Sequence, residues 1–442
     1  QGFTIRSAPS GKGALTLRLS LSTDLRGRLD ADKRGLSFPT EDGRTLRYDH
    51  LLAWDANGTA LDAELVYAPG EIRIIVQDAG AAYPLTIDPL IYLEQKVIAS
   101  DGAADDYFGD SVALNAAGDT AIVGTPWDDI GGNAHQGSAY VFARSGGVWS
   151  QQAKLTASDG AAYDLFGSSV QLNAAGDTAI VGALWDAIGA NAKQGSAYVF
   201  TRSGGVWSQQ AQLTASDGAA YDYFGRAVAL NAAGDTAIVG ASTHAVGANS
   251  EQGSAYVFTR GGGVWSQQAQ LTASDGAGVY WLGHSVALNA AGDTAIIGAY
   301  GSNVGANNYQ GSAYVFARSG GVWSQQAQLT ASDGAASDYF GRSVALNAAG
   351  DTAIVGAYHD DVGANVVQGS AYVFAPSAGN WIQQAKLTAS DGAAHDEFGG
   401  SVALNAAGDT AIVGACLDDV GANIYQGSAY VFARSGGVWS QQ

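Results

Sequence analysis

Residues 166–213 read FGSSVQLNAAGDTAIVGALWDAIGANAKQGSAYVFTRSGGVWSQQAQL, and close copies of this segment follow one another along most of the chain. The Phe-Gly step that begins it returns at Phe108, Phe224, Phe340 and Phe398, with Leu282-Gly283 in the fourth copy. The Gly-Asp-Thr step returns every 58 residues, at Asp119, Asp177, Asp235, Asp293, Asp351 and Asp409. A fixed period of this length indicates a repeat architecture.

Each copy contains four short segments with the alternation of polar and apolar residues that predicts half-buried strands. In the quoted copy they are residues 169–172, 178–181, 197–200 and 206–213. Turn-forming residues separate them, Asn-Ala-Ala-Gly-Asp after the first and Ser-Gly-Gly before the last. Four antiparallel strands per copy, with no helical segment between them, predict an all-β propeller whose blades bury their faces against one another.

The repeat resembles the FG-GAP repeat of integrin α-subunit propellers and of many bacterial surface proteins. Phe-Gly, the downstream Gly-Ala and the later Gly-Ser-Ala-Tyr-Val-Phe carry the resemblance, which covers roughly residues 91–442. The proline of the family's Gly-Ala-Pro appears only once, at Pro126. The resemblance implies a β-propeller on the outside of the cell, with a role in cell adhesion.

Two domains are expected. Residues 1–90 lack the repeat, and their alternating runs, such as Leu15 to Leu21 and Ile72 to Val76, predict a small β-sandwich-like domain. Residues 91–442 would form the propeller, with copies starting near residues 108, 166, 224, 282, 340 and 398. Residues 92–99 match the fourth strand of a copy, so they could close a ring of six blades. A ring of seven blades, as in integrins, is the alternative, in which case this chain is a fragment of a longer protein.

Composition limits the function. The net charge of −20 argues against nucleic acid as a partner, because few cations would face the phosphates. Cys416 is the only cysteine, so no disulfide can form within the chain. No apolar run is long enough to span a membrane, so this segment is not expected to insert into one. The chain contains no methionine, which indicates a processed or truncated protein. We expect a secreted or cell-surface location.

Metal binding is weakly supported. The family's Asp-rich calcium loop, between the first and second strands, is reduced here to Asn173-Ala174-Ala175-Gly176-Asp177. Because calcium takes about 6–8 oxygen ligands, one carboxylate and one amide are too few, and turn chemistry is expected instead. A second set of acidic residues, on the loop before each Phe-Gly, is a weak calcium candidate: Asp159, Asp164, Asp217, Asp222, Asp333 and Asp338. We expect no cofactor, with calcium possible.

Catalysis also has little support. The six histidines occupy non-equivalent positions, and no copy has serine, histidine and aspartate at a recognisable spacing. An enzyme could still assemble its site at the propeller axis from several blades. The residue two positions after each Phe (or Leu282) differs between copies, as such a site would require: Asp110, Ser168, Arg226, His284, Arg342 and Gly400.

Differences between copies gather in the second-to-third and fourth-to-first loops, which share one face of a four-stranded meander. Aromatic residues there have acidic neighbours such as Asp129 and Asp361, a combination suited to a protein or sugar ligand. The resemblance implies that this face binds ligand. The predicted ligand-binding residues are Tyr107, Trp127, Trp185, Tyr223, His244, Trp281, Tyr300, Tyr339, Tyr358 and His359.

The sequence therefore predicts a non-enzymatic, extracellular propeller that binds a protein or carbohydrate ligand in adhesion or surface attachment. Two alternatives remain open. One is a purely structural spacer within a larger surface protein, and the other is a polysaccharide-active enzyme that uses the central channel.

Overall fold

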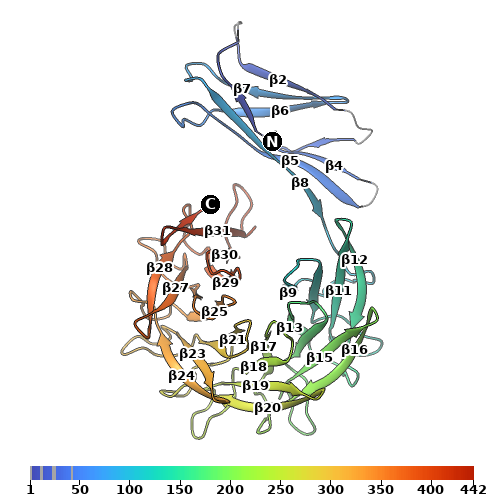
Figure 1. Ribbon diagram of the computed structural model, residues 1–442, viewed down its shortest axis with the longest axis vertical. Coiled ribbons are helices and arrows are strands. Elements are labelled where there is room, and N and C mark those ends of the chain that lie inside the picture. The colour runs from blue at the N-terminus through green and yellow to red at the C-terminus, as the bar shows by residue number, and fades with distance from the viewer. Residues whose placement is uncertain (1, 10–12, 22–25, 41–42) are drawn as a thin grey trace. The chain divides into compact units, whose positions relative to one another are not determined.

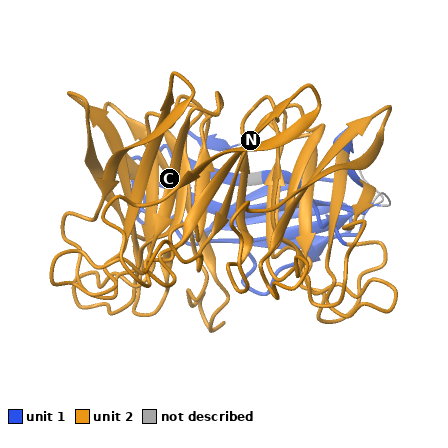
Figure 2. Ribbon diagram, turned by 90° about the horizontal axis from the view of Figure 1, so that it is seen from below, with its two compact units in different colours: residues 1–98, 144–150 blue, residues 99–143, 151–442 orange. Residues whose placement is uncertain are grey.

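The computed structural model describes residues 2–9, 13–21, 26–40 and 43–442. These residues form eight sheets and no helix (Figure 1). The chain divides into two compact units, residues 1–98 with 144–150 and residues 99–143 with 151–442 (Figure 2). The predicted all-β class is confirmed.

The first unit consists of two antiparallel sheets around one core. Its sheets have the strand orders β1-β8-β5-β4-β3 and β2-β7-β6. Residues that alternate along the strands point inward, and Leu65, Ile74 and Leu85 are fully buried. This is the predicted β-sandwich-like arrangement. The strands are β1 (Phe3–Ile5), β2 (Leu15–Ser20), β3 (Arg28–Leu29), β4 (Leu36–Pro39), β5 (Arg44–Trp54), β6 (Ala63–Ala68), β7 (Glu71–Val76) and β8 (Leu85–Gln95).

The second unit consists of six four-stranded antiparallel sheets, one per repeat, which we call blades 1 to 6. Their strands run between two sets of loops (Figure 2). The first strands are β9 (Ser111–Leu114), β13 (Phe166–Leu172), β17 (Phe224–Leu230), β21 (Ser285–Leu288), β25 (Phe340–Leu346) and β29 (Phe398–Leu404). The second strands are β10 (Thr120–Thr125), β14 (Thr178–Ala183), β18 (Thr236–Ala241), β22 (Thr294–Ala299), β26 (Ala353–Ala357) and β30 (Thr410–Ala415).

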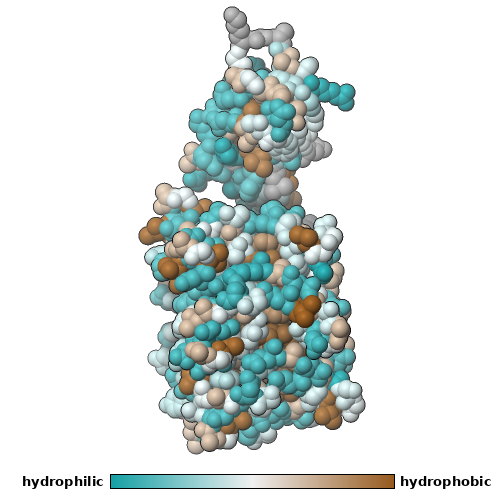
Figure 3. Space-filling view, turned by 90° about the vertical axis from the view of Figure 1, so that its left-hand side faces the viewer, coloured by the Kyte–Doolittle hydropathy of each residue, from teal (hydrophilic) through white to brown (hydrophobic). Residues whose placement is uncertain are grey.

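The two outer strands of each blade complete the sheets. The third strands are β11 (Ser138–Ser145), β15 (Ser196–Ser203), β19 (Ser254–Gly261), β23 (Ser312–Ser319), β27 (Ser370–Ser377) and β31 (Ser428–Ser435). The fourth strands are β12 (Val148–Leu155), β16 (Val206–Leu213), β20 (Val264–Leu271), β24 (Val322–Leu329), β28 (Asn380–Leu387) and β32 (Val438–Gln441). On the side of the molecule drawn in Figure 3, hydrophobic residues are dispersed among polar ones.

Blades pack through a repeated junction. Between blades 1 and 2, Ile122 and Val141 of one sheet meet Val170 and Phe200 of the next in a single buried cluster. Four further clusters of the same kind join the remaining neighbours. The Phe-Gly step serves this packing, because Phe166 is fully buried and forms a parallel bridge with Gly137 of the preceding blade. The strands predicted within one copy are thus confirmed, and the repeat acquires its core only by stacking.

Two expectations need correction. The sequence placed the domain boundary at residue 90, and one of its two alternatives had residues 92–99 close a ring of six blades. In the structure, β8 continues to Gln95 and pairs with β5, with Leu46 opposite Leu93 and Arg44 opposite Gln95. The first unit therefore extends to Ile98. The last blade is a sheet of β29 to β32 alone, so residues 92–95 do not complete it.

Candidate functional site

The variable loops of neighbouring blades form one continuous surface. The second-to-third loop of blade 1, residues 126–137, lies along the fourth-to-first loop that precedes blade 2, residues 156–165. The Tyr163 amide donates to the Ala134 carbonyl at 2.8 Å, and the Phe166 amide donates to the Gln136 carbonyl at 2.9 Å. The same bonds recur at the later junctions. We call this surface the loop face.

The backbone of the loop face is unusual. On the loop face, each repeat places three residues other than glycine in the left-handed region, where a side chain is sterically unfavourable. One of the three always directly precedes Phe-Gly or Leu-Gly, and these residues have φ between 53° and 56°: Tyr107, Leu165, Tyr223, Trp281, Tyr339 and Glu397. Strain concentrated on one face, in every copy, is a feature of ligand-binding loops held by a rigid scaffold.

Five of the predicted ligand-binding residues form a group of rings on blades 4 and 5. With Tyr309 they make up the aromatic cluster: Trp281, Tyr300, Tyr309, Tyr339, Tyr358 and His359. Ring centroids lie 4.9 Å apart for Trp281 and Tyr300, and 5.9 Å apart for Tyr300 and Tyr339. Tyr309 stacks on Trp281 at 6.3 Å, and Tyr339 contacts Tyr358 at 5.8 Å. All but Tyr309 are half-buried, so each keeps part of its ring accessible.

The other predicted aromatic residues lie apart from this cluster. Trp127 contacts Tyr107 at 5.8 Å and His135 at 4.9 Å, on blade 1. Trp185 on blade 2 is covered by the Lys193 ammonium group, which lies 3.7 Å from the ring centroid. Tyr223 on blade 3 is half-buried. Through His135, which lies 5.2 Å from the Tyr163 ring, the group on blade 1 reaches the loop that precedes blade 2. The loop face thus has aromatic residues on several blades, and the cluster on blades 4 and 5 joins the largest number of the predicted ligand-binding residues.

One prediction needs correction, because His244 is buried within blade 3. Its Nδ1 lies 2.9 Å from Asp222 and its Nε2 lies 3.4 Å from Asp217. Although burial opposes its charge, these two carboxylates raise the pKa of His244. His244 is therefore held inside the blade by two carboxylates and is not part of the exposed loop face.

Four exposed tyrosines of the loop face lie outside the predicted set. Tyr163, Tyr221, Tyr309 and Tyr425 have positive φ values and exposed rings. The signal was present, because each stands at a position that differs between copies. The predicted residues stand next to Phe-Gly and Gly-Ala, whereas these tyrosines lie farther along the same loops.

The acidic candidates for calcium are engaged by the protein itself. Asp164 accepts the Ala161 amide at 2.6 Å, and Asp159 accepts the Tyr198 hydroxyl at 3.0 Å. The partners repeat in the other copies, with Asp222 on Ala219, Asp338 on Ala335, Asp217 on Tyr256 and Asp333 on Tyr372. Within the described part of the chain, no three His, Cys, Asp or Glu side chains are arranged to hold a metal ion.

The loop that corresponds to the family's calcium site is closed by hydrogen bonds. Asn173 Oδ1 accepts the amides of Asp177 and Thr178 at 3.0 Å, and Asn173 Nδ2 donates to Asp177 Oδ1 at 2.8 Å. The amide and the carboxylate therefore bind each other and the turn backbone. This donor set does not fit a calcium ion, which needs several free oxygen ligands.

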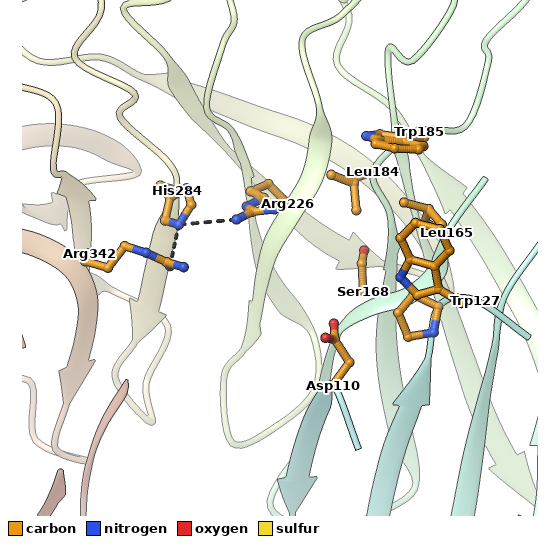
Figure 4. A pocket seen from close by; sticks show the side chains of 10 residues that line it. Asp110, Trp127, Leu165, Ser168, Leu184, Trp185, Arg226, His284 and Arg342 are labelled. Atoms are coloured by element: carbon orange, nitrogen blue, oxygen red, sulfur yellow. Dashed lines mark hydrogen bonds between the residues drawn. The ribbon is translucent and has the colours of Figure 1, made fainter. Parts of the chain in front are cut away.

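The unlike residues at the start of the first strands converge on a pocket at the propeller axis. This axial pocket has a volume of about 500 Å³ and is lined by residues of blades 1 to 5 (Figure 4). His284 Nε2 lies 3.5 Å from Arg226 and 2.5 Å from Arg342. Asp110 and Ser168 come from the first two blades, beside Trp127 and Trp185. Gly400, the sixth residue of the set, lines a different pocket.

Burial controls the charges of the axial pocket. It lowers the pKa of His284 well below the usual value, and the charges of Arg226 and Arg342 act in the same direction. His284 is therefore neutral and accepts hydrogen bonds through Nε2. Burial also raises the pKa of Asp110, against the attraction of Arg226. The pocket thus combines two guanidinium groups, one neutral imidazole and one carboxylate.

The fold and the loop face define a β-propeller repeat protein. The model of the FG-GAP repeat matches six segments, residues 92–142, 149–200, 207–258, 265–316, 323–374 and 381–432, which make up more than half of the chain. The chain belongs to the FG-GAP repeat family. FG-GAP repeats are typical of extracellular proteins and are generally protein-binding. No curated protein matches the sequence. Among the described residues there is no helix with the length and apolar character needed to cross a membrane.

Proposed function

We propose that this protein is a non-enzymatic, extracellular binding module that holds a protein or glycan ligand on the loop face, in adhesion or surface attachment. The aromatic cluster of blades 4 and 5 carries the proposal. Its rings contact one another from Trp281 to Tyr358, and Tyr309 is exposed. The secreted or cell-surface location is part of the proposal and is supported by the family.

The physics of aromatic rings supports binding at this cluster. A tyrosine or tryptophan ring offers a large apolar surface and a polar edge, and it loses little conformational entropy on binding. Neighbouring rings also hold one another in place: Tyr339 contacts Tyr300 and Tyr358, and Tyr309 contacts it at 6.2 Å. A surface that is ordered before the ligand arrives costs less free energy to engage.

The proposal is tested by a binding screen against glycans and extracellular-matrix proteins, run beside a variant that lacks two rings of the cluster. Tyr309→Gly and Tyr339→Gly suit this purpose, because both residues have positive φ and glycine tolerates that backbone. We expect at least tenfold weaker binding in the double variant. Tyr221→Gly with Tyr425→Gly, also at positive φ but outside the cluster, should bind like the wild type.

Other outcomes decide between the alternatives. Absence of any ligand in the screen would contradict the proposal and leave the structural spacer. Release of shortened glycans during incubation would contradict the non-enzymatic part and favour an enzyme at the axis.

A further inference from the structure

The axial pocket has an excess of hydrogen-bond donors on one wall. Arg226 and Arg342 both approach the same nitrogen of His284, at 3.5 and 2.5 Å. A neutral imidazole nitrogen has one lone pair, so it accepts one of these donors well and leaves the other poorly satisfied. Each guanidinium carries five N–H groups, so most donors at this wall remain available to a further acceptor.

The positive charge of this wall is not neutralised by close carboxylates. Within the described residues, neither Arg226 nor Arg342 forms an ion pair, whereas Lys154 and Lys386 each contact two aspartates. The Arg342 guanidinium instead lies 5.8 Å from the Tyr358 ring. In a chain with a net charge of −20, two unpaired arginines that share one histidine form a local site for an anion.

The opposite wall has a different character. Trp127, Trp185, Leu165 and Leu184 line it, and Figure 4 shows them across the pocket from the arginines. The indole ring of Trp127 provides a flat apolar surface, whereas the Lys193 ammonium group lies over the Trp185 ring. The volume of about 500 Å³ lies within the range of small-molecule sites. A ligand for this pocket therefore needs an anionic group at one end and a ring with an apolar face at the other.

We propose that the axial pocket binds an acidic sugar residue, with its carboxylate on Arg226 and Arg342 and its ring against the tryptophan wall. The proposal rests on the proposed function and names the ligand class of that same face. Guanidinium groups bind a carboxylate through two parallel hydrogen bonds, which fixes the orientation of the sugar. The aromatic cluster adjoins this site, because His284 contacts the Tyr300 ring at 4.6 Å. Further sugar residues of a chain would extend across it.

Calorimetry with three probes tests the ligand class, in a buffer without phosphate or sulfate. The probes are a trimer of galacturonic acid, the neutral trimer of galactose and a peptide of six glutamates. We expect the galacturonic acid trimer to bind at least tenfold more tightly than either other probe. Equal binding of the galactose trimer would overturn the role of the arginines. Tighter binding of the glutamate peptide would overturn the sugar in favour of an acidic protein.

Single substitutions locate the site. Arg342→Gln should weaken binding of the galacturonic acid trimer about tenfold or more, because it removes the charged donor while keeping an amide. Arg318→Gln is the matched control, since Arg318 lies on β23 and bonds to Gln268 away from the pocket. Asp110→Asn should tighten binding, because Asp110 is the one carboxylate of the pocket lining and repels an anion. Unchanged affinity in both Arg342→Gln and Asp110→Asn would overturn the site, even if the trimer binds.

The two proposals fail in different ways. A ligand that is lost in the Tyr309→Gly, Tyr339→Gly variant but kept in Arg342→Gln would support the proposed function and overturn the acidic-sugar site. Absence of any ligand in the glycan and protein screen, together with no heat from the galacturonic acid trimer, would overturn both.

Discussion

At the scale of single residues, the blades differ in the side chain that faces one pair of aspartates, of which one member is buried and the other exposed. In blade 1, the Lys154 ammonium lies 2.7 Å from Asp101 and 2.8 Å from Asp128. Blade 5 repeats the arrangement with Lys386. Blade 2 has Gln212 at that position, and its amide lies 3.2 Å from Asp186. Blade 2 therefore buries two carboxylates, Asp164 and Asp186, close to the exposed Asp159 and beside a neutral side chain.

Because of this difference, blade 2 lowers the free energy of unfolding by an amount that depends on pH. Burial raises the pKa of Asp186, and the charge of Asp159 acts in the same direction. Burial also raises the pKa of Asp164 to about 6, but it does the same for the equivalent Asp338 near Lys386 in blade 5, so only the contribution of Asp186 is specific to blade 2. Because these values exceed the value of about 3.9 for an unfolded chain, the folded state binds protons more tightly. Ionisation of these groups therefore destabilises the fold as pH rises through about 6, and the cost is absent below about pH 4.

Gln212→Lys should remove this cost by copying blades 1 and 5. We expect the variant to gain about 1 kcal/mol in free energy of unfolding at pH 8, and less at pH 5, which is closer to the raised pKa of Asp186. Urea unfolding at the two pH values measures the difference. Lys386→Gln is the reciprocal control and should lose stability at pH 8. An equal gain for Gln212→Lys at both pH values would contradict the assignment of the cost to these carboxylates.

The residue scale also shows what sequence comparison can find. Variation between copies led to Trp281, Tyr300, Tyr339 and Tyr358, whose rings contact one another on the loop face, and their role in ligand binding stays a prediction. The prediction from variation is wrong for His244, which varies for a different reason. His244 stands where other blades have a buried aspartate, such as Asp186, so its variation reflects charge balance inside a blade. Both kinds of residue differ between copies: exposed residues of the loops, and buried residues that change to match the charges of their neighbours. Sequence alone does not distinguish the two kinds.

At the scale of the blade, close contact between backbones explains the constant glycines. A Cβ atom at Gly240 would overlap the carbonyl oxygen of Gly283 in the next blade. Equivalent overlaps would occur at Gly124, Gly182, Gly298 and Gly356. The Gly of Gly-Ala and the Gly of Phe-Gly therefore meet at each junction. Each strand was predictable from its own alternation, but this junction joins residues of two copies and is visible only in the structure.

Gly240→Ala should separate blades 3 and 4 and cost about 1–3 kcal/mol in free energy of unfolding, the usual penalty for overpacking. Gly261→Ser is the matched control, because a Cβ there meets no atom within 4 Å and serine stands at the equivalent Ser203 of β15. The control should change stability by less than about 0.5 kcal/mol. Thermal melting compares the two, and a Gly240→Ala protein as stable as the control would show that the junction relaxes without cost.

Pairing between strands was the part of the fold that sequence did not decide. Residues 92–95 have the alternation of a fourth propeller strand, yet they pair with β5 in the sandwich. The local pattern specifies a half-buried strand and does not specify its partner. The partner strand depends on which sheet edge is near. Residues 92–95 continue the strand that begins at Leu85, so they stay in the same sheet as the rest of β8.

At the scale of the second unit, each of the two end blades exposes one face. The equivalent face is buried in the interior blades. Ile412 and Val431 of blade 6 are 46% and 40% exposed, whereas the equivalent Ile180 and Val199 are fully buried. At the other end, Val112 of blade 1 is 67% exposed and its equivalent Val170 is 5% exposed. These two faces are the ones that meet at every interior junction, so they are complementary to each other and to a further repeat.

A chain extended by one repeat should therefore be more stable. Residues 211–268 appended after Gln442 continue the pattern, because Gln442 is equivalent to Gln210. The added blade would cover Ile412 and Val431 with a sixth copy of the same junction, and in a repeat protein each junction adds to stability. We expect the melting temperature to rise by several degrees and the amides of β30 and β31 to exchange more slowly.

A control variant distinguishes the stabilisation that comes from packing from any effect of the added chain length. The same extension with Phe224→Ser and Val228→Ser in the appended segment keeps its size but removes two side chains that enter the junction at its original site. It should give little or no increase in melting temperature. If both extensions stabilise the chain equally, burial of the blade 6 face is not the cause. If the intact extension melts separately and leaves the original transition unchanged, the two faces are not complementary, and the interior junctions depend on more than the residues that the copies share.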